Sequence, residues 1–511
     1  MNTAALLSKA GVAHRDRVAL RFGDERLTYG ELDERVSRLA GALLTAGVER
    51  GDRLAIYMRN NPEYLITIFA AFRAGLCVVP VNVKLHASEL AYILGDAQCT
   101  GLVYGSDKST DVAEANAEAP LEHLVHVGEE GSGTSFADML AGGDPDTPLA
   151  DVAQDDLAWL FYTSGTTGFP KGAMLTHRNL IAMTMNTLSD VYSFQPEDIV
   201  LHPAPLSHGC GLYALASLAR GSDNIIYHHT NFDPAQMLQM VEDEHVSSVA
   251  FMAPTMIVML LDAPANIDTS SLRSVIYGGG PMHVDILREA LARFGKVFIQ
   301  IYGQGESPMT ISYLRAEDHD INDPEALAST GIARTDVEIR LVDDKGDEVA
   351  LGEEGEVSVS GDVVMKGYWN NPEATAKSLR DGWLHTGDIG RMDERGRLFL
   401  LDRKNDMIIS GGTNIYPREV EEALIEHEGV REAVVFGVPD TVWGESVFAC
   451  VVATPGASPT EEALIEFCKG RLASFKKPKR VELVDELPKN AYGKVLRREL
   501  KERYKDERIT R

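Results

Sequence analysis

Residues 157–172 read LAWLFYTSGTTGFPKG, an apolar run that passes directly into a loop of Gly, Ser and Thr. Such a run is typical of a buried strand, and ligands in parallel sheets lie just beyond the carboxyl ends of strands. The loop lacks the P-loop order, because Pro170 precedes Lys171 and Gly172 follows it. Its glycines still let backbone N–H groups converge on phosphate oxygens, with hydroxyls and one lysine beside them. A phosphate site is therefore predicted here, with a flexible turn as the alternative for the loop taken alone.

Strand and helix patterns alternate on both sides of this stretch. LAIYM (54–58) and GLVY (101–104) predict strands, and apolar residues recur on one face of 31–47, which predicts a helix ending at Gly47. The apolar segment 64–83 contains Arg73, Gly75 and Pro80, which favours a helix, a turn and a strand over a membrane span. The polar stretch 105–150 is expected to be a mobile surface excursion. This alternation predicts an α/β fold with mostly parallel sheets.

Two further glycine-bearing loops follow strands in the middle of the chain. SVIYGGG (274–280) and KVFIQIYG (296–303) predict strands with a helix between them. Because the carboxyl ends of parallel strands share one edge of a sheet, loops 278–281 and 302–306 are expected to border one cleft.

The character of the sequence changes after residue 330. Runs such as DVEIRLV and GEVSVSG predict a β-rich part, and a new α/β unit begins with helix 416–427. A second helix, 458–472, begins with a capping pattern. We therefore expect a large N-terminal domain over 1–402, a hinge at 403–406 and a small α+β C-terminal domain over 407–511.

Composition limits the classes of function. The 511 residues carry a net charge of −28, from 49 basic and 77 acidic residues, which argues against nucleic acid or an anionic membrane as main partner. The N-terminal sequence lacks the apolar core of a signal peptide. Five scattered cysteines without metal-ligand spacing favour a reduced, cytoplasmic location. The oligomeric state is left open, and a homodimer is compatible with the sequence.

Six motifs in a fixed order resemble those of the adenylate-forming superfamily, which includes acyl-CoA synthetases, luciferases and the adenylation domains of peptide synthetases. The motifs are YTSGTTGFPKG (162–172), YGGGPM (277–282), YGQGE (302–306), WLHTGD (383–388), DRKND (402–406) and PKNAYGKVLRREL (488–500). The resemblance covers nearly the whole chain. It implies a two-step reaction in which a carboxylate attacks ATP to give an acyl-adenylate and pyrophosphate, and a thiol then expels AMP. The implied cofactors are ATP, Mg²⁺ and coenzyme A, with a small carboxylic acid as substrate.

The resemblance also implies roles for individual residues. Lys494 would bridge the carboxylate and the α-phosphate, Glu306 would bind Mg²⁺ together with Thr167, and His208 would lie beside the acyl carboxylate. By composition alone these would be a solvated helix lysine, a surface carboxylate and a core histidine. The implied ATP and AMP contacts are Thr163, Ser164, Gly165, Thr166, Thr167, Gly168, Lys171, Gly279, Gly280, Pro281, Tyr302, Gly303, Gln304, Gly305, Asp388 and Arg403.

Acyl, CoA and hinge residues are implied in the same way. The acyl pocket would be lined by His208, Gly209, Gly211, Met252, Pro254, Thr255, Gly278, Gly279, Gly303 and Met309. CoA would contact Gly411, Gly412, Thr413, Lys476 and Lys477, with solvated surface lysines as the alternative for the last two. The hinge would lie at Lys404 and Asn405. Small and methionine-containing linings suit a medium-chain, long-chain, branched or aryl acid.

Two positions depart from the pattern of the superfamily. Gly305 stands where a threonine is usual, so a hydroxyl that contacts the AMP phosphate is absent, and Ser307 and Thr163 are the neighbouring hydroxyls able to replace it. Asn405 stands where the hinge residue is usually Asp or Lys, and Asn tolerates unusual backbone angles.

The leading hypothesis is an acid–thiol ligase that makes acyl-CoA. One alternative is an enzyme that delivers its acyl group to a carrier protein, and another is a nucleotide-binding homologue without catalysis. PLSHGCGLYA (205–214) has no acidic residue to hold a substrate ammonium, which disfavours an amino acid. A luciferase-type oxygenase has no motif against it but needs a special substrate.

Overall fold

The computed structural model describes residues 1–163, 170–264, 266–404, 406–410, 413–440, 442–489 and 495–505. Within these residues the chain forms two compact units. The first comprises 1–282, 288–339 and 359–384, and the second comprises 283–287, 340–358 and 385–511. The domain limits expected from the sequence, with a hinge at 403–406, stay a prediction.

The first unit contains two sheets, and the opening stretch of sequence lies in the smaller of them. Among the described residues this sheet has seven strands, in the order β7 (Thr134–Ser135), β6 (His123–Val127), β5 (Gly101–Gly105), β3 (Arg53–Tyr57), β4 (Cys77–Pro80), β8 (Leu157–Thr163) and β9 (Lys171–Thr176). All neighbouring strands are parallel except β8 and β9. The strand predicted at 157–162 is confirmed, and it leads into the candidate phosphate loop.

The expectation of a surface excursion over residues 105–150 is wrong. This stretch contains α5 (Ser109–Glu118), β6, β7 and α6 (Phe136–Gly142). Strand β6 pairs in parallel with β5 from Gly101↔His123 to Gly105↔Val127 and so extends the sheet. The polar composition of the segment hid a strand of only five residues, HLVHV, whose middle residues are buried.

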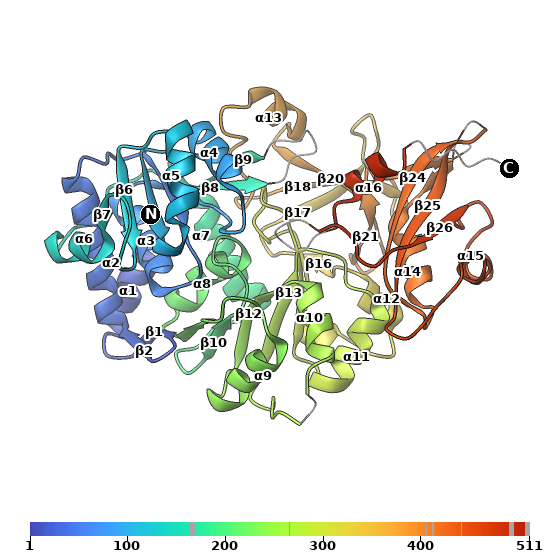
Figure 1. The fold of residues 1–511 in the computed structure, drawn as a ribbon, viewed down its shortest axis with the longest axis horizontal. Helices are drawn as coiled ribbons and strands as arrows, with labels where there is room; N and C mark the ends of the chain where they lie inside the picture. The colour runs from blue at the N-terminus through green and yellow to red at the C-terminus, as the bar shows by residue number, and fades with distance from the viewer. Residues whose placement is uncertain are drawn as a thin grey trace. The chain divides into compact units, whose positions relative to one another are not determined.

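The second sheet of this unit is larger and also mainly parallel. Its nine strands among the described residues run in the order β16 (Ile332–Ala333), β15 (Ser312–Leu314), β14 (Phe298–Tyr302), β13 (Ser274–Gly278), β12 (Ser248–Met252), β10 (Ile199–His202), β11 (Asp223–Ile226), β1 (Val18–Phe22) and β2 (Glu25–Thr28). In Figure 1 the blue and cyan part of the chain holds β3 to β7, and the green part holds β10 to β13. Strands β13 and β14, predicted from the sequence, are adjacent and parallel, so the loops that follow them lie at one sheet edge.

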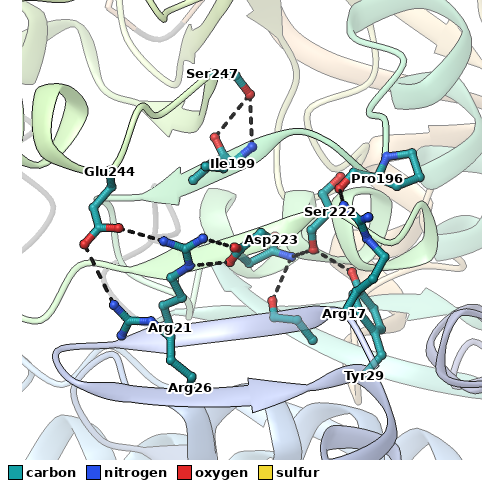
Figure 2. Close-up of polar contacts among 12 residues, drawn as sticks. Arg17, Arg21, Arg26, Tyr29, Pro196, Ile199, Ser222, Asp223, Glu244 and Ser247 are labelled. Carbon is teal, nitrogen blue, oxygen red and sulfur yellow. Dashed lines mark hydrogen bonds and ion pairs between the residues drawn. The ribbon is translucent and has the colours of Figure 1, made fainter. Parts of the chain in front are cut away.

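The N-terminal hairpin β1–β2 joins the second sheet through a charged network. Arg21 lies between Asp223 and Glu244, donating Nε to Asp223 Oδ1 at 2.9 Å and Nη1 to Glu244 Oε2 at 2.7 Å (Figure 2). Burial raises the pKa of Asp223, and Arg21 opposes this shift. The Tyr29 hydroxyl donates to the Ser222 carbonyl at 2.7 Å. These contacts bring the first thirty residues beside a strand almost two hundred residues later in the chain.

Helices of the first unit follow the local signals in the sequence. Helix α2 (Tyr29–Thr45) begins with a capping box between Thr28 and Glu31, and Gly47 follows its end at a φ of 99°. Besides α2, α5 and α6, the α-helices of this unit among the described residues are α1 (Ala5–Ala13), α3 (Pro62–Ala74), α4 (Ala87–Asp96), α7 (His177–Asn186), α8 (Gly209–Ala219), α9 (Pro234–Asp243), α10 (Pro254–Leu261), α12 (Pro324–Ala328) and α13 (Pro372–Ser378), together with most of α11 (Val284–Phe294).

The second unit combines β-rich and α/β parts, as predicted. It holds most of a sheet formed by β17 (Glu338–Val342), β18 (Glu354–Ser360), β20 (Trp383–Met392) and β21 (Leu398–Arg403), with β19 (Leu379–Arg380) on β20. A further sheet contains β23 (Thr413–Ile415), β22 (Ile408–Ser410), β25 (Gly444–Ala453), β24 (Val430–Asp440) and β26 (Arg480–Leu483). Helices α14 (Pro417–Ile425), α15 (Glu461–Lys469) and α16 (Arg497–Arg503) belong to this unit. The α/β fold class expected from the sequence is confirmed.

Across the part of the chain that the structure describes, every helix is too short or too polar to cross a membrane. All five cysteines lie in that part, as buried free thiols.

Candidate active site

Glu306 lies at the centre of a polar cluster in the first unit. It follows β14 in the loop YGQGE and is nearly buried, with 9% of its surface exposed. Its Oε1 accepts from the Tyr368 hydroxyl at 2.6 Å and from the Thr163 hydroxyl at 3.2 Å. Because both partners are neutral, they orient the carboxylate without cancelling its charge. A carboxylate of this kind is a suitable ligand for a hard divalent cation.

Tyr368 connects Glu306 with Lys171. The Lys171 ammonium lies 4.4 Å from the centre of the Tyr368 ring, a cation–π contact. Backbone bonds hold Tyr368 in place, because Trp369 N donates to Gly172 O at 2.8 Å and the segment runs along β9 as an extra bridge. Sequence reasoning missed Tyr368, since nothing in KGYWNN separates it from a core tyrosine.

Several predicted site residues lie outside the described residues. These are Ser164, Gly165, Thr166, Thr167 and Gly168 of the candidate phosphate loop, Asn405 of the hinge, Gly411 and Gly412 of the candidate CoA face, and Lys494. The two residues that bracket the phosphate loop, Thr163 and Lys171, are opposite each other in the β8–β9 register.

Gly305 has a steric explanation in this structure. A Cβ atom at this position would lie 2.5 Å from Thr163 Cγ2 and 2.7 Å from Phe161 Cδ1, closer than van der Waals contact allows. Its φ is not in the left-handed region, so space and not backbone conformation requires the glycine. Phe161 thus fills the volume in which a threonine side chain would lie. The alternation of LAWLFYT, which places Phe161 and Thr163 on one face of β8, was the available signal.

His208 precedes α8 and contacts the same phenylalanine. The His208 and Phe161 rings meet edge to face with centroids 5.4 Å apart. Its Nδ1 is 2.7 Å from the Ser207 hydroxyl. Burial lowers the pKa of His208 to about 4, so the imidazole is neutral at pH 7. A neutral imidazole can donate a hydrogen bond to an incoming carboxylate without adding charge.

The predicted acyl-pocket glycines surround a second phenylalanine. A Cβ at Gly209 would lie 2.5 Å from the Phe251 ring, and one at Gly279 would lie 3.4 Å from it. Met252, which was predicted to line the pocket, is fully buried, whereas its neighbour Phe251 is partly exposed on the opposite face of β12. Phe251 is therefore the residue of this strand that approaches the glycines.

Other predicted residues of the first unit lie at strand ends and helix starts. Gly303 packs so closely on Met309 that a Cβ would lie 2.5 Å from the Met309 Cα. Met309 has a φ of 61°, unusual for a residue with a side chain. Gly278 and Tyr302 are the last residues of β13 and β14, and Gln304 N donates to Ser307 O. Gly280 and Pro281 are exposed. Gly211 lies in the first turn of α8, and Pro254 and Thr255 begin α10.

The predicted ribose and hinge residues meet within the second unit. Arg403 Nε lies 3.2 Å from Asp388 Oδ1, where β20 and β21 pair. Lys404 contacts Asp344 at 2.7 Å and Glu356 at 3.4 Å. Asp388 and Arg403 thus contact each other, Lys404 contacts two carboxylates of the same unit, and their roles towards a ligand stay predictions.

The predicted CoA residues that the structure describes differ in their surroundings. Thr413 begins β23 and is exposed. Lys476 Nζ binds both carboxylate oxygens of Glu419 at 2.7 Å, so its charge is already paired. Burial, followed by nearby Lys479 and Lys469, lowers the pKa of Lys477.

Arg497 lies three residues after Lys494 in the sequence, at the start of α16. Its guanidinium lies 2.6 Å from Glu421, 3.0 Å from Asp406 and 3.6 Å from Asp402. Asp402 and Asp406 lie on either side of the predicted hinge residues Lys404 and Asn405. Burial alone would lower the pKa of Arg497, but the three carboxylates raise it.

Comparisons with known proteins show similarity over nearly the whole chain. A family model described as AMP-binding enzyme matches residues 7–369, and one for the AMP-binding enzyme C-terminal domain matches residues 419–494. The chain is 40% identical over 491 residues to a feruloyl-CoA synthase of an Amycolatopsis species, covering 95% of this chain and 96% of that protein. It is 34% identical over 517 residues to the medium/long-chain-fatty-acid–CoA ligase FadD8 of Mycobacterium tuberculosis, covering 98% and 89%. The crystal structure of ATP-bound MatB from Rhodopseudomonas palustris matches with a TM-score of 0.90 and 33% identity, covering 99% and 100% of the two chains.

Proposed function

Because the chain belongs to the AMP-binding enzyme family, as an AMP-forming ligase that joins a carboxylic acid to CoA, we propose that its acid is an aryl or fatty acid. The names of the relatives, feruloyl-CoA synthase and a medium/long-chain-fatty-acid–CoA ligase, support this range. The observation that carries the proposed site is the cluster of Glu306, Tyr368, Thr163 and Lys171 at the ends of β8, β9 and β14.

In the first step, the two anions ATP and carboxylate must meet. Lys171 and the loop hydroxyls would attract the β- and γ-phosphates that leave as pyrophosphate. Glu306 would hold Mg²⁺, which when bound neutralises phosphate oxygens. Tyr368 and Thr163 orient the Glu306 carboxylate, so that little reorganisation is needed when ATP binds.

On the acyl side, His208 would align the carboxylate. Its neutral imidazole suits this task. A positively charged imidazole would stabilise the free carboxylate and so weaken its attack on the α-phosphate. Phe161 holds the imidazole edge-on. The acid would thus be oriented for in-line attack, an effect of proximity and alignment.

The second unit would supply the remaining groups. Lys494 would bridge the carboxylate and the α-phosphate. Asp388 and Arg403 would bind the ribose and phosphate. Rotation at Lys404 and Asn405 would then withdraw the lysine and bring Gly411, Gly412, Thr413, Lys476 and Lys477 to CoA. A cytoplasmic location and a homodimer stay predictions from the sequence.

A screen of acids tests the proposed function. We expect ATP–pyrophosphate exchange that depends on an aryl or fatty acid, and AMP release that further requires CoA. Glu306→Gln is the matched variant, and its exchange should fall about a hundredfold or more, because preorganised electrostatic groups have effects of this size. The absence of exchange with short, medium, long and aromatic acids would contradict the proposal. AMP release with a carrier protein but not with CoA would favour the carrier-protein alternative.

A further inference from the structure

Arg334 is a buried cation without an anionic partner in the described part of the chain. It follows β16 in the first unit and is 1% exposed. Its Nη2 donates to the Met309 carbonyl at 2.9 Å, and its guanidinium lies 5.2 Å from the centre of the Tyr313 ring. Nε and Nη1 are buried and make no hydrogen bond within the described residues.

Three hydroxyl groups near this arginine have the same deficit. Tyr213, Ser307 and Thr310 are buried, and their side-chain oxygens lack a hydrogen-bond partner among the described residues. Ser307 and Thr310 belong to the turn around Met309, where Thr310 N donates to Ser307 O. Burial raises the pKa of Tyr213, and Arg334 opposes this shift through its positive charge and through a side-chain hydrogen-bond contact with the Tyr213 hydroxyl, a contact that falls short of good hydrogen-bond geometry. The Arg334 Nε and Nη1 groups and the hydroxyls of Ser307 and Thr310 therefore gather around the turn at Met309, with the Tyr213 hydroxyl of α8 beside the guanidinium.

Such an arrangement is costly without a ligand. A buried polar group without a partner loses about 1–3 kcal/mol, and a charged group loses more. Guanidinium N–H groups can only donate, and hydroxyls can donate as well as accept. The group that would complete the cluster is therefore an oxygen acceptor, and an anionic oxygen would compensate the guanidinium most effectively.

The cluster touches the residues that the proposed function assigns to the acid. Met309, whose carbonyl binds Arg334, packs against Gly303. On the other side the Tyr213 ring stacks on Phe251, with centroids 6.4 Å apart and an interplanar angle of 14°. Phe251 in turn is the ring that approaches Gly209 and Gly279. Arg334 is thus connected to the predicted acyl-pocket residues in two ways, through Met309 and through Tyr213 with Phe251.

We propose that Arg334, together with the Tyr213 hydroxyl, binds an oxygen-bearing group at the end of the acid that lies away from the reacting carboxylate. The substrate class is then an acid with a second carboxylate, a phenolic hydroxyl or a keto oxygen at its far end. This inference rests on the proposed function, because it places the acid beside Gly209, Gly279 and Met309. It makes Arg334 a residue that determines specificity.

Matched pairs of acids test the proposal. Each pair has the same length or ring, with and without the far oxygen, in a dicarboxylate, a phenol and a ketone series. For the preferred series the wild type should show a higher kcat/KM for the oxygen-bearing acid. Arg334→Met should reduce this ratio about tenfold to hundredfold, the effect of losing a hydrogen bond to a charged group, with most of the change in KM. Arg334→Lys, which keeps the charge, should restore part of the ratio.

Arg315→Met is the control, because Arg315 is an exposed arginine that directly follows β15 and is paired with Asp318. It should leave every ratio unchanged. An equal fall for both members of each pair in Arg334→Met, or an unchanged ratio in every series, would overturn the proposal and indicate a packing role or a buried water. The proposed function is supported if the wild type catalyses ATP–pyrophosphate exchange with either acid of a pair. If no acid supports exchange, the proposed function is wrong. The inference is then tested by calorimetry, from the ratio of the Kd values with which the protein binds the two acids of a pair.

Discussion

Two arginines, one buried and one partly buried, have opposite surroundings in this protein. Arg497, in the second unit, is surrounded by Glu421, Asp406 and Asp402. Arg334, in the first unit, is more deeply buried, yet it meets a backbone carbonyl and an aromatic ring and no carboxylate within the described residues. Three carboxylates surround the single positive charge of Arg497, whereas no carboxylate of the described residues offsets the charge of Arg334.

The difference separates a structural arginine from one that we assign to a ligand. Carboxylates that flank the predicted hinge hold Arg497, so its guanidinium connects the start of α16 with the segment 402–406. Arg334 makes no comparable ion pair within the described residues, and we expect its buried charge to lower the stability of the free protein. A stability cost next to a candidate substrate site is expected where the site is built for binding.

The largest effect is expected for Arg497→Met. Removing the cation leaves three partly buried carboxylates unpaired, which should destabilise the second unit by about 3–5 kcal/mol. Hydrogen exchange should show lost protection in β24 and α16, while β8 and β9 of the first unit keep theirs. Destabilisation should lessen as the pH falls towards 4, because the carboxylates then bind protons. Unchanged protection in β24 would mean that the carboxylates are hydrated in the native state and that the arginine is not structural.

The reverse sign is expected for Arg334→Met. Methionine has similar length and no charge, so it removes the desolvation cost and should raise the stability of the ligand-free protein by about 1–2 kcal/mol. The midpoint of chemical denaturation, followed without ATP or acid, measures this change. A marked loss of stability would show that Arg334 has compensating partners, and it would remove the contrast with Arg497.

The smallest effect is expected for Asp402→Asn, because Asp406 and Glu421 still compensate Arg497. Burial raises the pKa of Asp402, and Arg497 opposes this only in part. A raised pKa in the folded state contributes stability at low pH that is lost as the pH rises through the folded value. The asparagine in the variant does not titrate, so the variant does not lose this stability. Its free energy of unfolding relative to the wild type should therefore rise, by about 1 kcal/mol at most, from pH 4 to pH 7. A relative decline over this range would show that the Asp402 charge stabilises the native unit.

Much of the fold and part of the site could be predicted because the signals are local. The apolar run of β8 and the glycines after it, the capping box of α2, and the strands that precede Gly279 and Gly303 are encoded within a few residues each. The short strand β6 escaped notice because its polar flanks resemble a loop, and its pairing with β5 comes from a part of the chain about twenty residues away.

The site residues that sequence reasoning missed are those whose roles depend on distant neighbours. Tyr368 reaches Glu306 across 62 positions of the chain, and Phe161 occupies the space of a side chain at position 305. In the same way, the burial of Arg334 and the position of Phe251 against Gly209 follow from packing between separate strands and helices.

The amino-acid sequence by itself determined the α/β class, the strand–loop motifs and the positions of Lys171 and Glu306 at strand ends, because hydrophobic period and turn chemistry act over short distances. Only the tertiary structure decided that Glu306 is held by neutral hydroxyls, that a side chain at position 305 would collide with Thr163 and Phe161, and that Arg497 is paired with carboxylates while Arg334 has none among the described residues. Those properties are set by volume and charge between segments that meet only in the folded chain, and a linear sequence does not state which segments meet.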